Sequence, residues 1–258
     1  MKRVNGGSAV IDTEAPWKLK RRNLKKPPYA YTMSPMEWQA LLARAKQGDA
    51  EAEWEVAGRY EDGCSNGSGE ALVRRSSQKT IEWTRRAAEH GLIPAQIALG
   101  VLLGKGAEAL AWTKKAYRAG KDSCAANNIA VTYRENGNLR MAVQWFRRCV
   151  ALGDDDAQVQ LGLHYYWGKG VRKNPEAAVR CFRKATKGKN ICEAGRNDAY
   201  FYLGFAYFEG NGVKQSFATA RRLFQRANVD GDHQAASEML RLLPQRRDES
   251  AKQNRLAL

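Results

Sequence analysis

Long apolar runs, paired cysteines and prolines are scarce in this chain of 258 residues. No segment approaches the ~20 consecutive apolar residues of a membrane-spanning helix, so we expect no span. The N-terminus starts basic but lacks the apolar region of a secretory signal, which argues against Sec-type export. The chain has five cysteines, an odd number, and their spacing does not indicate a disulfide framework. They favour free thiols in a reducing compartment. With only seven prolines, the chain is expected to be a helical, cytoplasmic protein.

Acidic residues are also in short supply. Lys and Arg total 43 against 27 Asp and Glu, a formal net charge of +16. The excess is concentrated near the N-terminus, ahead of Pro27 and Pro28, which block a helix. We interpret residues 1–33 as a flexible basic arm and residues 245–258 as a polar tail. The cations of the arm are Lys18, Lys20, Arg21, Arg22, Lys25 and Lys26.

A pattern of small and apolar residues recurs through residues 49–231. Each unit has an apolar residue followed by a small one, with an aromatic residue or Leu four positions after the apolar residue. This spacing puts the side chains on one face of a helix, and the small residue allows a second helix to approach closely. The pairs are Val56–Ala57, Leu99–Gly100, Ile129–Ala130, Leu161–Gly162 and Leu203–Gly204.

A second helix follows in each unit. In the first three units it carries a tryptophan, which we take as the anchor that packs on the first helix: Trp83, Trp112 and Trp145. Glycine-rich segments at residues 168–171 and 210–213 fit tight turns between the paired helices. The repeating unit is therefore a helical hairpin.

These units resemble the Sel-one-like repeat, a relative of the tetratricopeptide repeat. The match is closest in the fourth and fifth units, where it rests on Ala157, Leu161–Gly162, Tyr165, residues 168–171, Ala178, Phe182 and Ala185, with the same spacing from Ala199 to Ala227. The resemblance implies an all-α, right-handed superhelical solenoid of about five antiparallel helix pairs that acts as a binding platform. It also implies roles such as adaptor or immunity protein, without inherent catalysis.

The ends and insertions of the array can also be located. Residues 34–48 resemble a lone second helix and residues 232–244 a lone first helix, so we expect them to cap residues 49–231. Two insertions interrupt the period, at residues 64–76 and 189–198. Such loops are candidate contact points, although sequence drift explains them equally well.

Two surfaces are candidate partner sites. On the second helices, the positions two and three residues after the anchor form a basic stripe, interpreted either as a solvated face or as a track for an acidic partner or a phosphate backbone. It comprises Arg85, Arg86, Lys114, Lys115, Arg147, Arg148, Arg183 and Lys184. On the first helices, aromatic residues either stack between units or line a concave groove. They are Tyr166, Trp167, Tyr200, Tyr202, Phe205 and Phe208.

Catalytic and metal-binding motifs are not found. Residues 63–67 match the spacing of a serine nucleophile elbow, but a helix stands before Ser65 where that motif needs a strand. The three histidines are scattered, and no paired Cys-x-x-Cys or phosphate-binding loop is present. We therefore expect no cofactor, metal, small-molecule substrate or membrane. The expected function is a non-catalytic scaffold that binds a protein with an acidic surface through the concave groove of the repeats, mainly in the fourth and fifth units. The alternative is a nucleic-acid-binding accessory protein that uses the basic arm and the stripe.

Overall fold

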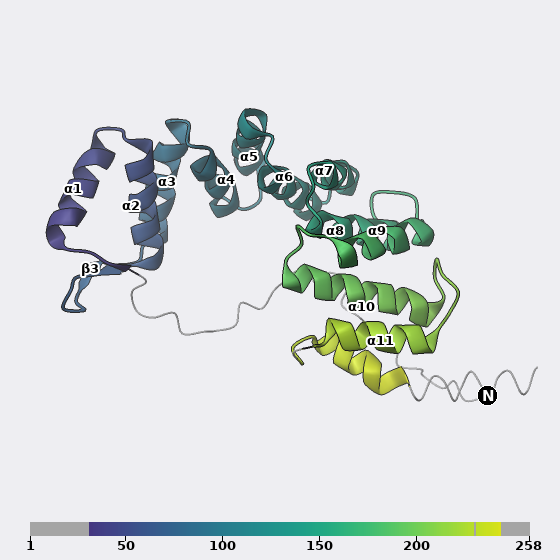
Figure 1. Ribbon diagram of the computed structural model, residues 1–258. Coiled ribbons are helices and arrows are strands. Elements are labelled where there is room, and N and C mark those ends of the chain that lie inside the picture. Colours follow the sequence, from purple (N-terminus) through teal and green to yellow (C-terminus); the bar gives the residue numbers. More distant parts are fainter. Residues whose placement is uncertain (1–30, 230, 244–258) are drawn as a thin grey trace, which may run out of the picture.

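The structure is a computed structural model that describes residues 31–229 and 231–243. The described chain is mostly helical, and its helices pack in chain order into an elongated, curved array (Figure 1). The all-α solenoid expected from the repeat is therefore confirmed. The basic cations of residues 18–26 and the tail of residues 245–258 lie outside the described residues.

Five helical hairpins make up the array. They are α2 (Ala50–Asp62) with α3 (Ser77–Glu89), α4 (Ile93–Leu102) with α5 (Ala107–Gly120), α6 (Ser123–Glu135) with α7 (Leu139–Ala151), α8 (Asp156–Trp167) with α9 (Pro175–Lys187), and α10 (Glu193–Glu209) with α11 (Phe217–Ala227). Helix α1 (Pro35–Lys46) packs on α2 at one end, and a helical segment at residues 234–243 follows α11 at the other (Figure 1). The second helix of each unit also packs on the first helix of the next.

Polar side chains define where these helices begin. Ser34 caps α1 by accepting a hydrogen bond from the Glu37 backbone N–H, while the Glu37 carboxylate accepts one from the Ser34 N–H. Other helices are capped by a side chain that accepts a hydrogen bond from the backbone N–H three residues later, without the reciprocal carboxylate: Asp49, Ser76, Asp122, Asn138, Asn174 and Ser216. Helices α8 and α10 end at Gly168 and Gly210 in the left-handed conformation. Local sequence therefore sets the hairpin boundaries.

The two helices of a hairpin meet at the small residue of the first helix. A Cβ atom on Gly162 would lie 2.8 Å from Cδ1 of Phe182, and one on Gly204 would lie 2.9 Å from Cε1 of Phe224. Phe182 and Phe224 each come one residue after Cys181 and Leu223, which occupy the anchor position in the fourth and fifth units. The residues that follow the anchor are all buried, with relative exposures of 0–1%: Thr84, Thr113, Phe146, Phe182 and Phe224. The anchor assignment was therefore off by one residue, since Trp83 and Trp145 are less deeply buried, with relative exposures of 8% and 6%.

Neighbouring hairpins meet through the turns of the fourth and fifth units. Gly170 and Gly212 have φ angles of +71° and +75°. Gly170 lies directly on the backbone of Leu139 at the start of α7, and Gly212 on that of Pro175 at the start of α9. A Cβ on Gly212 would lie 2.7 Å from the Glu176 backbone nitrogen. Each turn therefore docks on the preceding unit, which is why it needs glycine for both conformation and space.

The insertion at residues 64–76 forms strands, which the sequence did not indicate. Strands β1 (Tyr31–Thr32), β2 (Cys64–Ser65) and β3 (Ala71–Val73) form a small sheet in that order, with β1 parallel and β3 antiparallel to β2. The Met33 N–H extends the pairing by donating to the Ser65 carbonyl at 2.9 Å. The prediction that the flexible arm extends to residue 33 is thus wrong for residues 31–33, because backbone hydrogen bonds hold them against the insertion.

Candidate partner-binding surfaces

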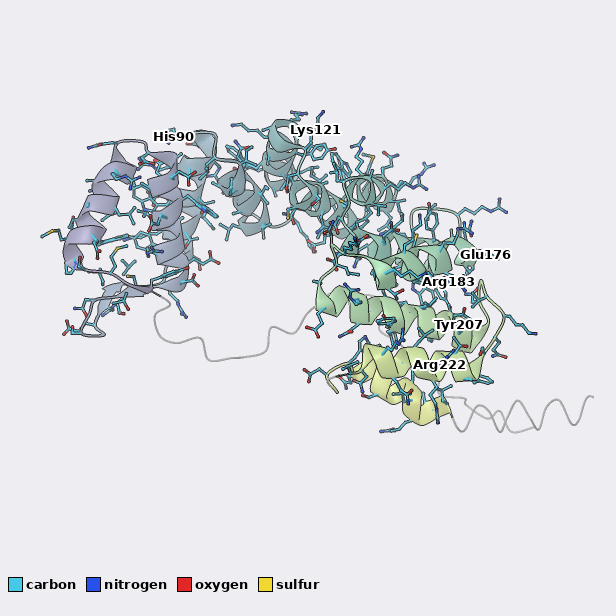
Figure 2. The ribbon with its side chains drawn as sticks, viewed as in Figure 1. His90, Lys121, Glu176, Arg183, Tyr207 and Arg222 are labelled. Carbon is cyan, nitrogen blue, oxygen red and sulfur yellow. The ribbon has the colours of Figure 1, made fainter. Side chains whose placement is uncertain are left out.

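Half of the predicted basic stripe connects consecutive units. Arg147 of α7 donates a 2.9 Å hydrogen bond to the Tyr165 hydroxyl of α8, and Arg183 of α9 donates one of 2.7 Å to Tyr207 of α10 (Figure 2). The Lys114 ammonium lies 5.2 Å from the centre of the Tyr133 ring in the same relationship. Where the second unit has Leu103 instead of tyrosine, Arg85 pairs with Glu108. These cations therefore help to hold consecutive hairpins against one another.

The other half of the stripe covers the tryptophans. The guanidinium carbons of Arg86 and Arg148 lie 4.4 Å and 4.2 Å from the ring centres of Trp83 and Trp145, and Lys115 lies 4.8 Å from Trp112. These are cation–π distances. In the fourth unit the corresponding residue is Cys181, which offers Lys184 no aromatic ring. A cation over a ring keeps its charge and most of its N–H donors, so the stripe still gives the surface a positive potential.

The positive charge is densest on the last three second helices. Helices α7, α9 and α11 together expose ten cations and contain one carboxylate, that of Glu176. We call these cations the outer basic surface: Arg140, Arg147, Arg148, Arg180, Arg183, Lys184, Lys187, Arg221, Arg222 and Arg226. Charge of one sign at this density steers an anionic partner toward the surface.

The predicted aromatic groove is largely filled. Tyr166, Tyr202 and Phe205 have relative exposures of 2%, 9% and 8% and lie in the largest core cluster, so their assignment to a partner-contacting groove is wrong. Tyr166 also donates a 2.6 Å hydrogen bond to the Glu209 carboxylate. Burial of the Tyr166 side chain, helped by that carboxylate, raises the pKa of its phenol. The stacking alternative accounts for these three residues. Trp167, Tyr200 and Phe208 remain at least partly exposed.

The insertion at residues 189–198 is held rigidly on the fourth unit. The Asp155 carboxylate accepts a 3.0 Å hydrogen bond from the Asn190 N–H, and that of Asp156 accepts one of 3.1 Å from the Cys192 N–H. Arg196 donates at 3.0 Å to the Gly188 carbonyl at the end of α9. The insertion therefore forms a fixed start to α10, a helix of 17 residues compared with 10–13 for the other first helices.

An open pocket of about 510 Å³ lies beside this insertion. Four of its lining residues belong to the insertion: Ile191, Glu193, Arg196 and Asn197. The others are Tyr200 of α10, Arg226 of α11 and Val229. We call it the insertion pocket. Tyr200, predicted for the groove, thus lies with Arg226, whose guanidinium carbon is 5.6 Å from the centre of its ring.

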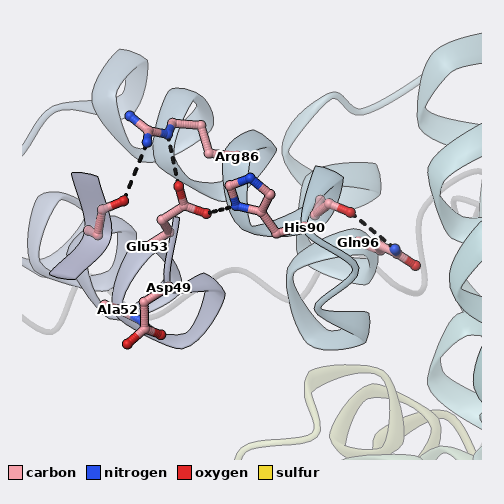
Figure 3. A network of polar contacts seen from close by, with 8 residues as sticks. Asp49, Ala52, Glu53, Arg86, His90 and Gln96 are labelled. Atoms are coloured by element: carbon pink, nitrogen blue, oxygen red, sulfur yellow. Dashed lines mark hydrogen bonds and ion pairs between the residues drawn. The ribbon is translucent and has the colours of Figure 1, made fainter. Parts of the chain in front are cut away.

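A buried carboxylate joins the first three helices. Glu53 of α2 is fully buried, and it pairs with Arg86 at 2.9 Å and with Nδ1 of His90 at 2.7 Å, both from the end of α3 (Figure 3). Arg86 also donates to the Ala45 carbonyl of α1 at 3.3 Å. This contact was not predicted from the sequence, although an acidic residue among the core positions of a helix is a signal that a cation must lie opposite. The network holds the capping helix α1 on the first hairpin. It also engages Arg86, one of the residues of the basic stripe.

Three of the cysteines, Cys64, Cys149 and Cys181, are buried in the packing of the helices and the small sheet. Burial raises the pKa of the Cys149 thiol to about 12, and it also raises the pKa values of the Cys64 and Cys181 thiols. These side chains are therefore protonated at neutral pH. Ser65 has a relative exposure of 8%, and its hydroxyl donates a hydrogen bond to the Tyr31 carbonyl at 3.4 Å. The segment around Ser65 is thus part of the small sheet.

Within residues 31–229 and 231–243, no cluster of three His, Cys, Asp or Glu side chains could hold a metal ion. The helices of that part of the chain are too short or too polar to cross a membrane.

Comparison with protein families gives a repeated match. The Sel1 repeat model matches five consecutive segments, residues 50–92, 93–121, 126–154, 155–190 and 197–228. Each segment corresponds to one of the hairpins described above, although the third and fifth begin after the first residues of α6 and α10. Residues 191–196, which supply three of the residues that line the insertion pocket, fall between the fourth and fifth matches.

Solved structures show the same architecture. The chain is 28% identical to c5321, a protective antigen of uropathogenic Escherichia coli with an SLR fold, over 80% of this chain and 44% of that one, with a TM-score of 0.64. A Sel1 repeat protein from Oxalobacter formigenes is 24% identical over 78% of this chain and 81% of that one, with a TM-score of 0.60. YrrB, a TPR protein with an unusual peptide-binding site, is 19% identical over 79% of this chain and 98% of that one, with a TM-score of 0.50. The chain thus spans less than half of the Escherichia coli protein's length.

Proposed function

Because the chain belongs to the Sel1 repeat family, we propose that it is a non-catalytic scaffold that holds a partner protein on the exposed faces of its hairpins. The observation that carries this proposal is how the apolar side chains are used. The repeated positions are buried within and between units. What remains is a long surface formed by the second helices, with a rigid insertion at one end.

The charge of that surface indicates the chemistry of the partner. The outer basic surface fits an acidic protein face, with which association is fast and sensitive to salt. The fold of YrrB, described as having a peptide-binding site, is a precedent for a helical-hairpin array that holds a peptide. An adaptor or immunity role, in which the partner is held or occluded rather than transformed, is consistent with this surface. We also place the protein in the cytoplasm, since all five cysteines are free thiols.

Capture of partners from native lysate, with and without nuclease, tests the scaffold. We expect a protein to be retained after nuclease treatment and to be lost from the double variant Arg180→Glu, Lys187→Glu, which reverses two exposed charges of the outer basic surface. The matched control is Arg74→Glu, Lys105→Glu, the same change of charge at exposed residues outside α7, α9 and α11. Equal retention by all three proteins would contradict an acidic partner on this surface.

Nucleic-acid binding is the second candidate, and the outer basic surface also supports it. In this case affinity for any DNA or RNA should fall steeply with salt, because counterions are released from the phosphates. Deletion of residues 1–30, which removes Lys18, Lys20, Arg21, Arg22, Lys25 and Lys26, should abolish binding while leaving β1 in place. Binding that survives this deletion, or that nuclease does not affect, would contradict the second candidate.

A further inference from the structure

We propose that the insertion pocket binds an acidic peptide segment of the partner, with a carboxylate on Arg226 and a neighbouring apolar side chain against Tyr200 and Val229. This inference rests on the scaffold function and adds where a partner is recognised and by what chemistry. It concerns the end of the fifth hairpin where α10 begins and α11 ends, and it uses Tyr200 of the predicted groove residues.

The pocket is built rather than incidental. Asp155 and Asp156 hold the backbone of the insertion through the Asn190 and Cys192 N–H groups, at 3.0 Å and 3.1 Å. Gly195 packs directly on the Asp156 carboxylate, where a side chain would clash. A loop left over from sequence drift would not need this set of contacts. Because the walls are fixed before a ligand arrives, less conformational entropy is lost on binding.

The size and lining of the pocket suit part of a peptide. Its volume of about 510 Å³ is in the range of small-ligand sites. Val229 is 74% exposed at its edge, and Ile191 and the Tyr200 ring add apolar surface. An exposed aliphatic side chain beside an aromatic ring is a place where a partner's apolar side chain gains contact area.

The charges select a single carboxylate. The exposed Arg226 guanidinium lies 5.6 Å from the centre of the Tyr200 ring, and the described residues give it no carboxylate partner. Arg196, the other cation, is already engaged by the Thr186 and Gly188 carbonyls at 3.4 Å and 3.0 Å. Glu193 lies on the rim and repels a second negative charge. Among the residues that line the pocket, Arg226 alone offers a guanidinium without an engaged carbonyl, and Glu193 lines the pocket with it. This lining favours a peptide carboxylate over a phosphate backbone, which requires several cations in a row.

Selection of short random peptides on phage, with the full chain immobilised, tests this assignment. We expect enriched peptides in which Asp or Glu adjoins Leu, Ile, Val or an aromatic residue. For the synthetic consensus peptide, Arg226→Gln should lower the affinity by about tenfold and Tyr200→Ala by a similar factor, the size expected for a hot-spot contact. Arg222→Gln is the matched control, because Arg222 is exposed on the same helix but does not line the pocket.

Several outcomes would overturn the proposal: no enrichment, enriched peptides without acidic residues, or equal losses for Arg222→Gln and Arg226→Gln, which would indicate diffuse charge attraction. Displacement of the peptide by a single-stranded oligonucleotide whose binding depends on Arg226 would assign the pocket to nucleic acid instead. If Arg226→Gln and Tyr200→Ala retain the partner captured from lysate in full, the pocket assignment fails while the scaffold function stands.

Discussion

Arg183 of α9 and Tyr207 of α10 form a hydrogen bond of 2.7 Å between two hairpins. The same pair recurs one unit earlier as Arg147 and Tyr165, at 2.9 Å. The basic residue comes from the second helix of one unit and the hydroxyl from the first helix of the next. The repeat therefore encodes a contact between consecutive hairpins. The basic residues that the sequence assigns to a binding surface also hold neighbouring units together.

Removal of the Tyr207 hydroxyl tests this contact. Tyr207→Phe should lower the free energy of unfolding by about 0.5–1 kcal/mol, the lower part of the range for a hydrogen bond, because Arg183 is exposed. The measurement is urea unfolding of Tyr207→Phe, Arg183→Met and the double variant. We expect a coupling energy of about 0.5 kcal/mol. Strictly additive effects would show that the pair adds no stability.

Two helical glycines should respond in opposite ways to alanine. Gly162 lies directly beneath the Phe182 ring, whereas a Cβ on Gly58 of α2 would meet nothing within 4 Å. Gly58→Ala should stabilise the protein by about 0.5–1 kcal/mol because alanine favours helix. Gly162→Ala should destabilise it by about 1–3 kcal/mol because the hairpin must open. Chemical denaturation measures both, and a stabilised Gly162→Ala variant would refute the close packing.

Turn docking can be separated from backbone strain. Gly212 and Gly137 have nearly the same φ, +75° and +77°, but only Gly212 lies against a neighbouring backbone, that of Pro175 and Glu176. Alanine at either position costs about 1–2 kcal/mol for the left-handed conformation. Gly212→Ala should cost about 1–3 kcal/mol more, as expected for overpacking. Thermal unfolding of both variants gives the difference, and equal losses would argue against docking between units.

His164 makes stability depend on pH. Burial lowers the pKa of His164, and its Nδ1–H donates to the Lys169 carbonyl at 2.6 Å. The unfolded chain therefore binds a proton more readily than the folded one, so this contribution is full above pH ~6.5 and is lost as pH falls through the folded pKa.

The variant His164→Asn keeps an N–H donor but cannot titrate. We expect it to lose less stability than the parent protein when urea unfolding at pH 7 is compared with unfolding at pH 5.5. Parallel pH profiles for the two proteins would show that His164 does not carry this dependence.

The sequence predicted the hairpins because each repeats the same chemistry. Leu161–Gly162 and Leu203–Gly204 have identical spacing to their turns, so five units support one interpretation. The small sheet could not be predicted in this way, since β2 at Cys64–Ser65 pairs with Tyr31–Thr32, far away in the chain. The helical periodicity places Phe205 on an apolar face of its helix. It does not show whether the next unit covers that face.

The central claim is that a protein partner docks on the exposed second helices and the insertion pocket. Hydrogen–deuterium exchange of the nuclease-treated complex, compared with the free chain, tests it most directly. We predict slower exchange in α9, α11 and residues 189–198, with α2 and α4 unchanged. Slower exchange confined to the first helices, or equal exchange in the free and bound chain, would contradict the account.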